Sequence, residues 1–159
     1  MLNKKGFTLI ELIIIITILG VISVMAIPNI INIQQKNTKK QYIQDAKDYI
    51  VEFQYQEKTN TNLSYTLVRC AKTNINVYNI SNIKRIKIEK SPNGNTYEGQ
   101  VAKIGNNYAI CLSENSDKGK TVIATLNDLY EDDAITRVYD KQSGDCIADS
   151  GKSICDAIK

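Results

Sequence analysis

The chain has 159 residues and a formal net charge of +3, which is the length of one folded domain with an extended element. So small a charge excludes the basic footprint of a nucleic-acid-binding protein, and no specific nucleic-acid partner is expected. The charge is uneven, because residues 36–113 hold 12 Lys/Arg and 6 Asp/Glu whereas residues 114–159 hold 6 and 10. These two regions could meet between subunits, or they could form a solvated surface of mixed sign.

The N-terminal segment has a short basic start and then a long apolar run. Lys4, Lys5 and Gly6 precede Phe7–Ile27, 21 residues that span roughly 31 Å as a helix, about the hydrocarbon thickness of a bilayer. Unlike a secretory signal, the small residue stands before the apolar run, and no Ala-x-Ala-like site follows it. We therefore expect one membrane-spanning segment that stays on the mature protein, with the lysines on the cytoplasmic side and the head outside.

The carboxylate of Glu11 needs its own explanation. A charge at the bilayer centre costs about 2.5–3.5 kcal/mol on insertion scales, although a position near the cytoplasmic end reaches headgroup water. If the chain is cleaved after Gly6, Phe7 gains a free amine four residues before Glu11. The two charges can neutralise each other within one chain or between neighbours, and the second arrangement gives an incoming helix a docking register.

The sequence of residues 4–12, Lys-Lys-Gly-Phe-Thr-Leu-Ile-Glu-Leu, together with the apolar run closely resembles the N-terminus of type IV pilins and related pseudopilins. The resemblance is confined to this N-terminal segment. It implies that a membrane-embedded prepilin peptidase cuts after Gly6 and N-methylates Phe7. It also implies that Glu11 forms an assembly salt bridge with the N-terminus of a neighbouring subunit.

Two residues weaken the apolar helix. Pro28 lacks an N–H and clashes with the preceding turn, so a kink or an interruption is expected there. Gly20 costs about 1 kcal/mol relative to Ala in a helix interior. The resemblance matches Gly20 and Pro28 to the helix-breaking pair of the family, between which a subunit could extend under load.

Beyond Pro28 the apolar pattern becomes one-sided, which is typical of a helix with a single buried face. We predict helix from Phe7 to about Lys58, ended by the stretch Thr59–Asn62. The apolar positions recur at three- and four-residue steps and are Tyr42, Ile43, Ala46, Tyr49, Ile50 and Phe53.

The remainder of the chain is predicted to be rich in β-strands. Ile83–Ile88, Tyr97–Ile104 and Tyr108–Leu112 are separated by Pro/Gly/Asn turn signals and predict a three-stranded antiparallel meander. Thr121–Leu126 is a candidate fourth strand, and Leu63–Val68 is either a short strand or a loop. The apolar face of this sheet would cover the buried stripe of the helix.

These elements predict an α+β fold, and the resemblance makes it pilin-like: a long N-terminal α-helix packed on a small antiparallel β-sheet head. The expected organisation is a cleaved leader at 1–6 and a hydrophobic transmembrane and filament-core helix at 7–28. An amphipathic helix that packs on the head follows at 29–58. The globular β-rich head at 59–159 ends in a loop bracketed by cysteines.

Four cysteines, Cys70, Cys111, Cys146 and Cys155, all lie in the expected head. Their even number and the exported topology favour two disulfides, for which three connectivities exist. We favour Cys146 with Cys155, which closes a short C-terminal loop and leaves Cys70 with Cys111. Zinc is the alternative, but without a Cys-x-x-Cys pair or any histidine the spacing gives it little support, so no metal is expected.

Catalytic motifs are missing from the sequence. There is no histidine, no Gly-rich phosphate loop and no Gly-x-Ser-x-Gly, so we expect neither an enzyme nor a bound cofactor. The acidic run Glu131, Asp132 and Asp133 could bind Ca²⁺ weakly, but it lacks EF-hand spacing and a solvated acidic turn is favoured.

The resemblance therefore implies a structural subunit of a helical homo-oligomeric filament, with the prepilin peptidase and the pilus assembly machinery as partners. It implies a single-pass protein of the cytoplasmic membrane before assembly and an extracellular pilus on the bacterial surface afterwards. A major pilin is favoured over a minor pilin, and over a pseudopilin of a secretion or DNA-uptake system. A single-pass anchored binding module is a distant alternative, and it would keep Lys4 and Lys5.

Overall fold

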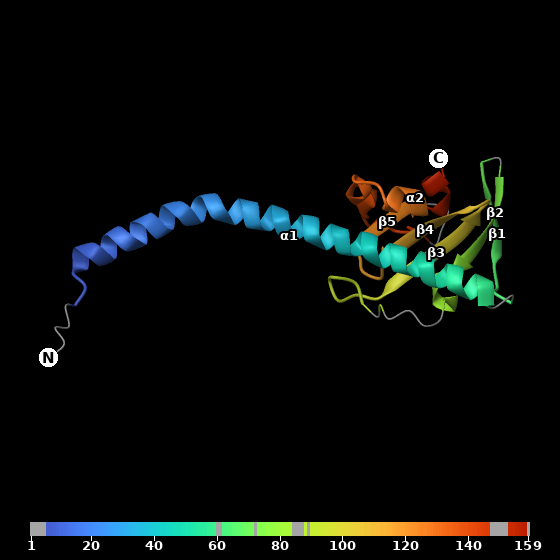
Figure 1. The fold of residues 1–159 in the computed structure, drawn as a ribbon, viewed down its shortest axis with the longest axis horizontal. Coiled ribbons are helices and arrows are strands. Elements are labelled where there is room, and N and C mark those ends of the chain that lie inside the picture. The colour runs from blue at the N-terminus through green and yellow to red at the C-terminus, as the bar shows by residue number, and fades with distance from the viewer. Residues whose placement is uncertain are drawn as a thin grey trace. The chain divides into compact units, whose positions relative to one another are not determined.

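The structure is a computed structural model that divides into two compact units, Met1–Asn37 and Thr38–Lys159 (Figure 1). One helix, α1 (Leu9–Thr59), runs through both units. Within α1, residues 25–29 are described by their backbone alone. The residues that the structure describes are 6–59, 62–71, 73–83, 88, 90–146 and 153–158.

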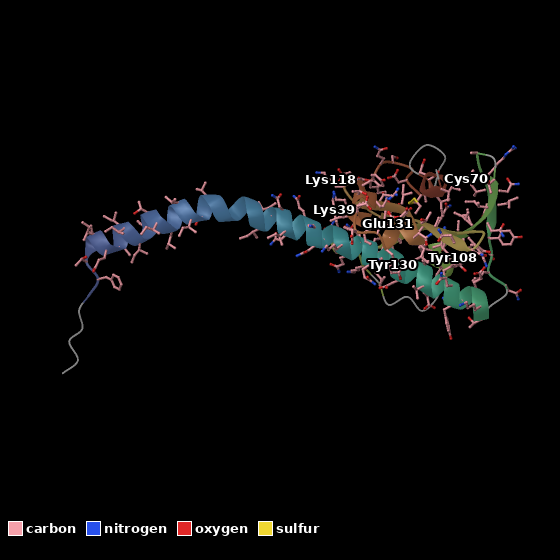
Figure 2. All side chains as sticks on the ribbon, turned by 45° about the horizontal axis from the view of Figure 1, so that its top comes forward. Lys39, Cys70, Tyr108, Lys118, Tyr130 and Glu131 are labelled. Carbon is pink, nitrogen blue, oxygen red and sulfur yellow. A yellow bond between two sulfur atoms is a disulfide. The ribbon has the colours of Figure 1, made fainter. Side chains whose placement is uncertain are left out.

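The first unit contains the apolar part of α1, whose side chains stand out on all sides of the helix (Figure 2). Its large apolar side chains between Leu9 and Val24 are 41–76% exposed. The hydroxyls of Thr17 and Ser23 donate to carbonyls one turn earlier, those of Ile13 and Leu19, over 2.5 and 2.7 Å. Over the described part of the chain, no helix is both long and apolar enough to cross a membrane.

Helix α1 continues through Gly20 and Pro28, so an interruption is absent from this structure, and the alternative of a kink stays a prediction. Pro28 removes only one helical hydrogen bond, and many bonds on either side keep the helix cooperative past that loss. The role of this pair as an extension point in a filament stays a prediction.

The second unit combines the C-terminal half of α1 with a six-stranded antiparallel sheet whose strands follow chain order, β1-β2-β3-β4-β5-β6. In such a meander each strand pairs with the next one along the chain, and the turn at Gly105, with φ +59°, joins the two longest strands. The strands are β1 (Thr66–Cys70), β2 (Thr73–Asn79), β3 (Tyr97–Ile104), β4 (Asn107–Glu114), β5 (Lys120–Thr125) and β6 (Val138–Asp140). The short helices are η1 (Ile80–Asn82), α2 (Leu126–Leu129), η2 (Ala134–Arg137) and η3 (Ile154–Ile158).

Both faces of the sheet are buried, which the alternation along β4 shows. Ile110 and Leu112 belong to the core against α1, whereas Ala109 and Cys111 belong to a second core on the opposite face. The second core is covered by the C-terminal segment, including η3. On the first face, Phe53 of α1 is fully buried among aromatic rings of the sheet.

The α+β prediction is confirmed, and several strands fall where the sequence indicated. Tyr97–Ile104 is β3, Tyr108–Leu112 lies inside β4, and β5 covers most of Thr121–Leu126. Residues 84–87 of the predicted strand Ile83–Ile88 lie outside the described residues. Strands β2 and β6 were not predicted. In the open segment Leu63–Val68, the residues from Thr66 onward belong to β1, and residues 63–65 precede the strand.

All four cysteines form disulfides, but the favoured pairing is wrong. The bonds join Cys70 to Cys155 and Cys111 to Cys146, each with Cα atoms 5.3 Å apart. Cys111 lies on the face of the sheet that the C-terminal segment covers, and Cys146 of that segment bonds it there. Cys155, further along the same segment, bonds Cys70 at the end of β1. Once a fold has brought distant segments together, short sequence separation no longer ranks the pairings.

Candidate functional site

The start of α1 is closed by a reciprocal pair of hydrogen bonds between Thr8 and Glu11. Glu11 Oε2 accepts from the Thr8 backbone N–H and from Thr8 Oγ1, both at 2.8 Å, and the Glu11 N–H donates to Thr8 Oγ1 at 3.4 Å. This is a capping box, which satisfies N–H groups that the first turn leaves without partners. The negative charge also lies at the positive end of the helix dipole.

The capping box gives Glu11 a structural role that the sequence reasoning missed. The signal was present, since Thr-x-x-Glu before an apolar run is the sequence signature of a capping box. Both bonds to the carboxylate go to Oε2. No described residue bonds its second oxygen, Oε1, which could accept from a donor outside this first turn, such as the amine of another chain.

The predicted cleavage position lies directly ahead of the helix. Gly6 and Phe7 precede the first helical residue, Phe7 is 79% exposed, and no atom lies within 4 Å of the position that a Gly6 Cβ would occupy. Exposed, non-helical backbone of this kind is readily bound by proteolytic enzymes. Gly6, Phe7 and Glu11 thus lie together at one helix start, while Gly20 and Pro28 lie further along α1 and the four cysteines lie in the head.

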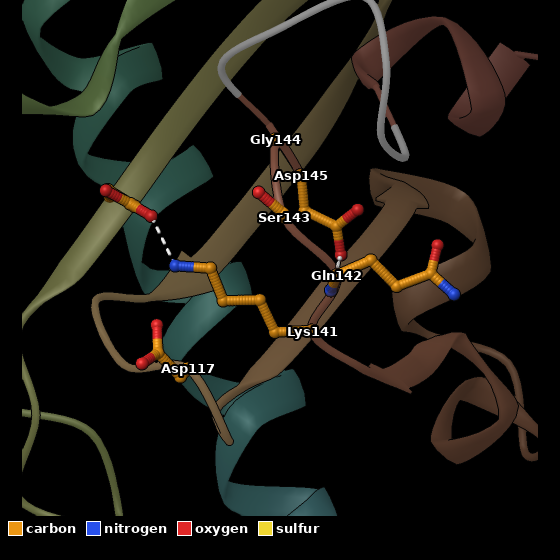
Figure 3. A pocket seen from close by; sticks show the side chains of 7 residues that line it. Asp117, Lys141, Gln142, Ser143, Gly144 and Asp145 are labelled. Atoms are coloured by element: carbon orange, nitrogen blue, oxygen red, sulfur yellow. Dashed lines mark hydrogen bonds and ion pairs between the residues drawn. The ribbon is translucent and has the colours of Figure 1, made fainter.

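A polar pocket of about 330 Å³ lies in the head near the turn after β6 (Figure 3). Lys141 Nζ donates to Glu98 Oε1 at 2.5 Å and to the Glu114 carbonyl at 2.6 Å. The buried Asp145 accepts from the Gln142 N–H and from Thr121 Oγ1, both at 2.9 Å. Lys141 and Asp145 are thus held by bonds to neighbouring strands and to the turn itself, and the lining residues include no arrangement of nucleophile and base. The lining residues are Glu98, Asp117, Lys141, Gln142, Ser143, Gly144 and Asp145.

Metal binding finds no support in the described residues. None of their His, Cys, Asp and Glu side chains form a group of three or more that could hold a metal ion, and the Ca²⁺ alternative at Glu131–Asp133 gains nothing from the structure. The zinc alternative is excluded, because all four cysteine sulfurs are used in disulfides.

A buried carboxylate, Glu114, ties the turn at Ser91–Asn95 to the sheet. It is fully buried and accepts from Ser91 Oγ, from the Lys120 N–H at 2.7 Å and from Asn93 Nδ2 at 3.3 Å. Burial acts to raise the pKa of Glu114, but the hydrogen bonds from Ser91, Tyr42 and Lys120 outweigh it and hold the pKa below its ordinary value. Glu114 is therefore ionised and fully hydrogen-bonded inside the head.

A second buried carboxylate, Asp45, lies on α1. It accepts from the Tyr97 hydroxyl of β3 at 2.5 Å. Burial raises the pKa of Asp45 above its ordinary value, and the single hydrogen bond from Tyr97 offsets that only in part. The two carboxylates link helix, sheet and turn, which makes this region of the head a structural centre.

Comparison with known proteins concerns the N-terminus. Residues 1–27 match the family model of the prokaryotic N-terminal methylation motif, which is the prepilin-like signal of type IV pilins. No curated protein and no solved structure matches the chain. A long N-terminal helix followed by a six-stranded antiparallel sheet is a pilin-like layout.

The chain thus carries a prepilin-type N-terminus on a pilin-like α+β fold. The motif supports a type IV pilin-like or pseudopilin protein, a class that is structural rather than catalytic. It implies processing by a prepilin peptidase and assembly into a pilus, and it suggests a membrane-anchored precursor that becomes part of a surface pilus.

Proposed function

We propose that this chain is the major structural subunit of a type IV pilus. A prepilin peptidase cleaves between Gly6 and Phe7, the new amine of Phe7 is methylated, and the mature chain polymerises through its N-terminal helix into a helical homo-oligomer. The observation that carries this proposal is the motif at residues 4–12, followed by the apolar part of α1.

The apolar part of α1 supplies the cohesion of the filament. Its exposed side chains, from Leu9 to Val24, lose water when neighbouring helices pack around them, at about 25 cal/mol per Å² of buried apolar surface. Before assembly, residues 7–28 anchor the precursor in the cytoplasmic membrane with the head outside. Because lipid is also apolar, the transfer from bilayer to filament gains less than the transfer from water, and specific contacts must fix the arrangement.

Glu11 supplies one such contact. An unpaired carboxylate in an apolar bundle is costly, so Glu11 favours positions where a positive charge is in reach. Its Oε2 is held by Thr8, and Oε1 accepts from the methylated ammonium of Phe7 in a neighbouring subunit. This pairing sets the axial register of the incoming subunit.

The test is mass spectrometry of intact chains from sheared and purified surface filaments. We expect a chain that begins at Phe7, carries one added methyl group and makes up the bulk of the filament. The same processed chain as a trace component would assign it to a minor pilin, and its confinement to a secretion or uptake apparatus would assign it to a pseudopilin. An N-terminus that retains Lys4 and Lys5 on a membrane-bound monomer would overturn the proposal.

A further inference from the structure

The exposed side of α1 in the head carries charges of opposite sign on its two flanks. Successive residues of a helix are about 100° apart around its axis, so Lys40, Lys47 and Lys58 lie within about 20° of one another. We call this the lysine flank. Asp48 and Glu52 lie about 90–130° further round the helix and form the acidic flank.

Between the two flanks lies an exposed apolar strip formed by Val51 and Tyr55, each 51% exposed. Tyr42, Ala46 and Phe53, which are fully buried against the sheet, lie on the opposite side of the helix. The strip therefore faces away from the head and has no cover among the described residues.

The charged side chains of the two flanks form no ion pairs with described residues of the head. The four ion pairs among the described residues involve none of the three lysines and neither of the two carboxylates. Asp48 and Glu52 accept instead from the neutral amides of Gln44 and Gln56, at 2.8 and 3.0 Å. Neutral partners leave the negative charge of the acidic flank uncompensated.

One lysine of the lysine flank, Lys47, contacts an aromatic ring of the head. Lys47 Nζ lies 4.4 Å from the centre of the Tyr130 ring, in a cation–π contact within the head. Lys40 and Lys58 are exposed and lie at either end of the flank. These two are the lysines best placed to meet another molecule.

We propose that this side of α1 packs against a second copy of the chain in parallel orientation, with the lysine flank of one copy against the acidic flank of the next. The reason is geometric. When two helices lie side by side with their apolar strips facing the same way, a parallel pair brings the lysine flank of one against the acidic flank of the other. An antiparallel pair instead brings two flanks of the same charge together. Like charges in contact are strongly unfavourable, so the pattern selects the parallel arrangement.

This inference rests on the proposed function, because a parallel second copy is what a pilus supplies. It adds a register-setting contact in the head that is independent of Glu11. The contact is open, since one flank remains available at each end of a row of copies, and an open contact of this kind generates a helical polymer. Each exposed ion pair adds little affinity, so the flanks determine the orientation of the copies. The cohesion of the filament comes from the apolar part of α1.

The experiment reverses the flanks separately and together in the full chain, produced in its own cells without the native copy. The first variant is Lys40→Glu with Lys58→Glu, and the second is Asp48→Lys with Glu52→Lys. The second variant places like charges along the whole contact, and the first does so except at Lys47, so we expect the yield of sheared surface filaments to fall at least about tenfold. The swapped chain with all four substitutions should restore that yield.

Two controls separate the possible causes. Lys118→Glu changes an exposed charge outside α1 (Figure 2) and should leave the filament yield unchanged. Thermal unfolding of each variant checks that its head is folded. Co-production of the two reversed variants in one cell should restore filaments that contain both chains, because their flanks are complementary.

Reversed variants that give the yield of the Lys118→Glu control would overturn the inference while leaving the proposed function intact. A swapped chain that stays as poor as the reversed variants would overturn it equally. If the native chain itself forms no filament, it is the proposed function that fails.

Discussion

The two halves of α1 place similar apolar residues in opposite situations. In the first unit, large side chains such as Ile10 and Ile22 are 66% and 57% exposed, whereas Ile50 and Phe53 in the second unit are fully buried. The sheet provides a cover for the second half, whereas the large apolar side chains of the first half are exposed. The second half of α1 therefore stabilises the head, and the first half presents an apolar surface to other molecules.

The carboxylates of the two halves differ in the same way. Glu11 is exposed and its partner is the neighbouring Thr8, so its contacts are local. Asp45 is bound by Tyr97, a residue 52 positions away in the sequence, so its contact depends on the folded head. Changes in the first half should thus act on assembly, and changes on the buried face of the second half should act on stability.

The largest effect is expected at the cleavage position. Gly6→Leu should leave the fold unaltered, because nothing lies near the Gly6 Cβ position, but a bulky side chain beside the scissile bond should block the peptidase. We expect an uncleaved chain and no surface filaments, read from intact mass and shearing. Filaments of ordinary yield that contain the uncleaved chain would remove the assignment of Gly6.

On the other half of α1, Phe53→Ala should destabilise the head by about 3–5 kcal/mol, the usual cost of removing a buried ring. Phe53 packs on Tyr78 and Tyr108, with ring centres 4.7 and 6.0 Å away. Chemical denaturation measures the loss. Val51→Ala, on the exposed side of the same helix, is the matched control and should stay within about 0.5 kcal/mol of the native chain.

Removing the Cys70–Cys155 disulfide by changing both residues to Ala should cost about 2–4 kcal/mol of head stability. Peptide mapping without reduction provides the direct check of connectivity. It should recover Cys70 linked to Cys155 and Cys111 linked to Cys146, and any peptide that links Cys146 to Cys155 would contradict the structure.

Acid should destabilise the head partly through Glu114. Its pKa is lowered in the folded state, so its contribution is complete above the ordinary glutamate value of about 4.3 and is lost as the pH falls through the folded pKa. Asp45 acts in the opposite direction, because its pKa is raised and protonation on acidification relieves the cost of its buried charge.

Glu114→Gln separates these two contributions. The variant should be less stable by about 1–3 kcal/mol at neutral pH, since a buried charged hydrogen-bond acceptor is lost. Its stability should then fall less steeply than that of the native chain below about pH 4. Denaturation curves at several pH values measure both quantities, and parallel pH profiles would remove the role given to Glu114.

The smallest effect is expected at the start of α1. Thr8→Ala removes the hydroxyl that caps the first turn and should weaken that turn by about 1 kcal/mol, without affecting the head. Amide hydrogen exchange should show faster exchange confined to the first turn. Altered stability of the head in the same variant would contradict the separation of the two halves.

The sequence predicted the elements whose signals are local. α1 follows from its continuous apolar run and then from the apolar periodicity after Pro28, and β3 with β4 follows from alternation around a Gly/Asn turn. β2 was missed because Thr73–Asn79 contains three asparagines, a residue depleted in strands, although Ile75 and Val77 alternate onto the buried face. Its strand character comes from the neighbouring strands rather than from its own composition.

Other features depend on contacts that no local pattern encodes. The disulfide pairing required the position of Cys111 in the sheet, and the network of Glu114 required the turn at Ser91 to fold over it. The charged flanks of α1 follow from the sequence by helical spacing, but they can be recognised only once the buried face of the helix is known. The capping box at Glu11, in contrast, is a local feature, because Thr-x-x-Glu before an apolar run is its sequence signature.

The disulfide between Cys70 and Cys155 encloses 85 positions of chain, and with them every strand from β2 to β6. A tensile load that travels along α1 leaves the helix at Thr59 and reaches this covalent ring after β1. Strands inside a closed ring cannot be unravelled one after another by a pull along the backbone. Mechanical lengthening is thereby directed away from the head and into the helix that precedes it.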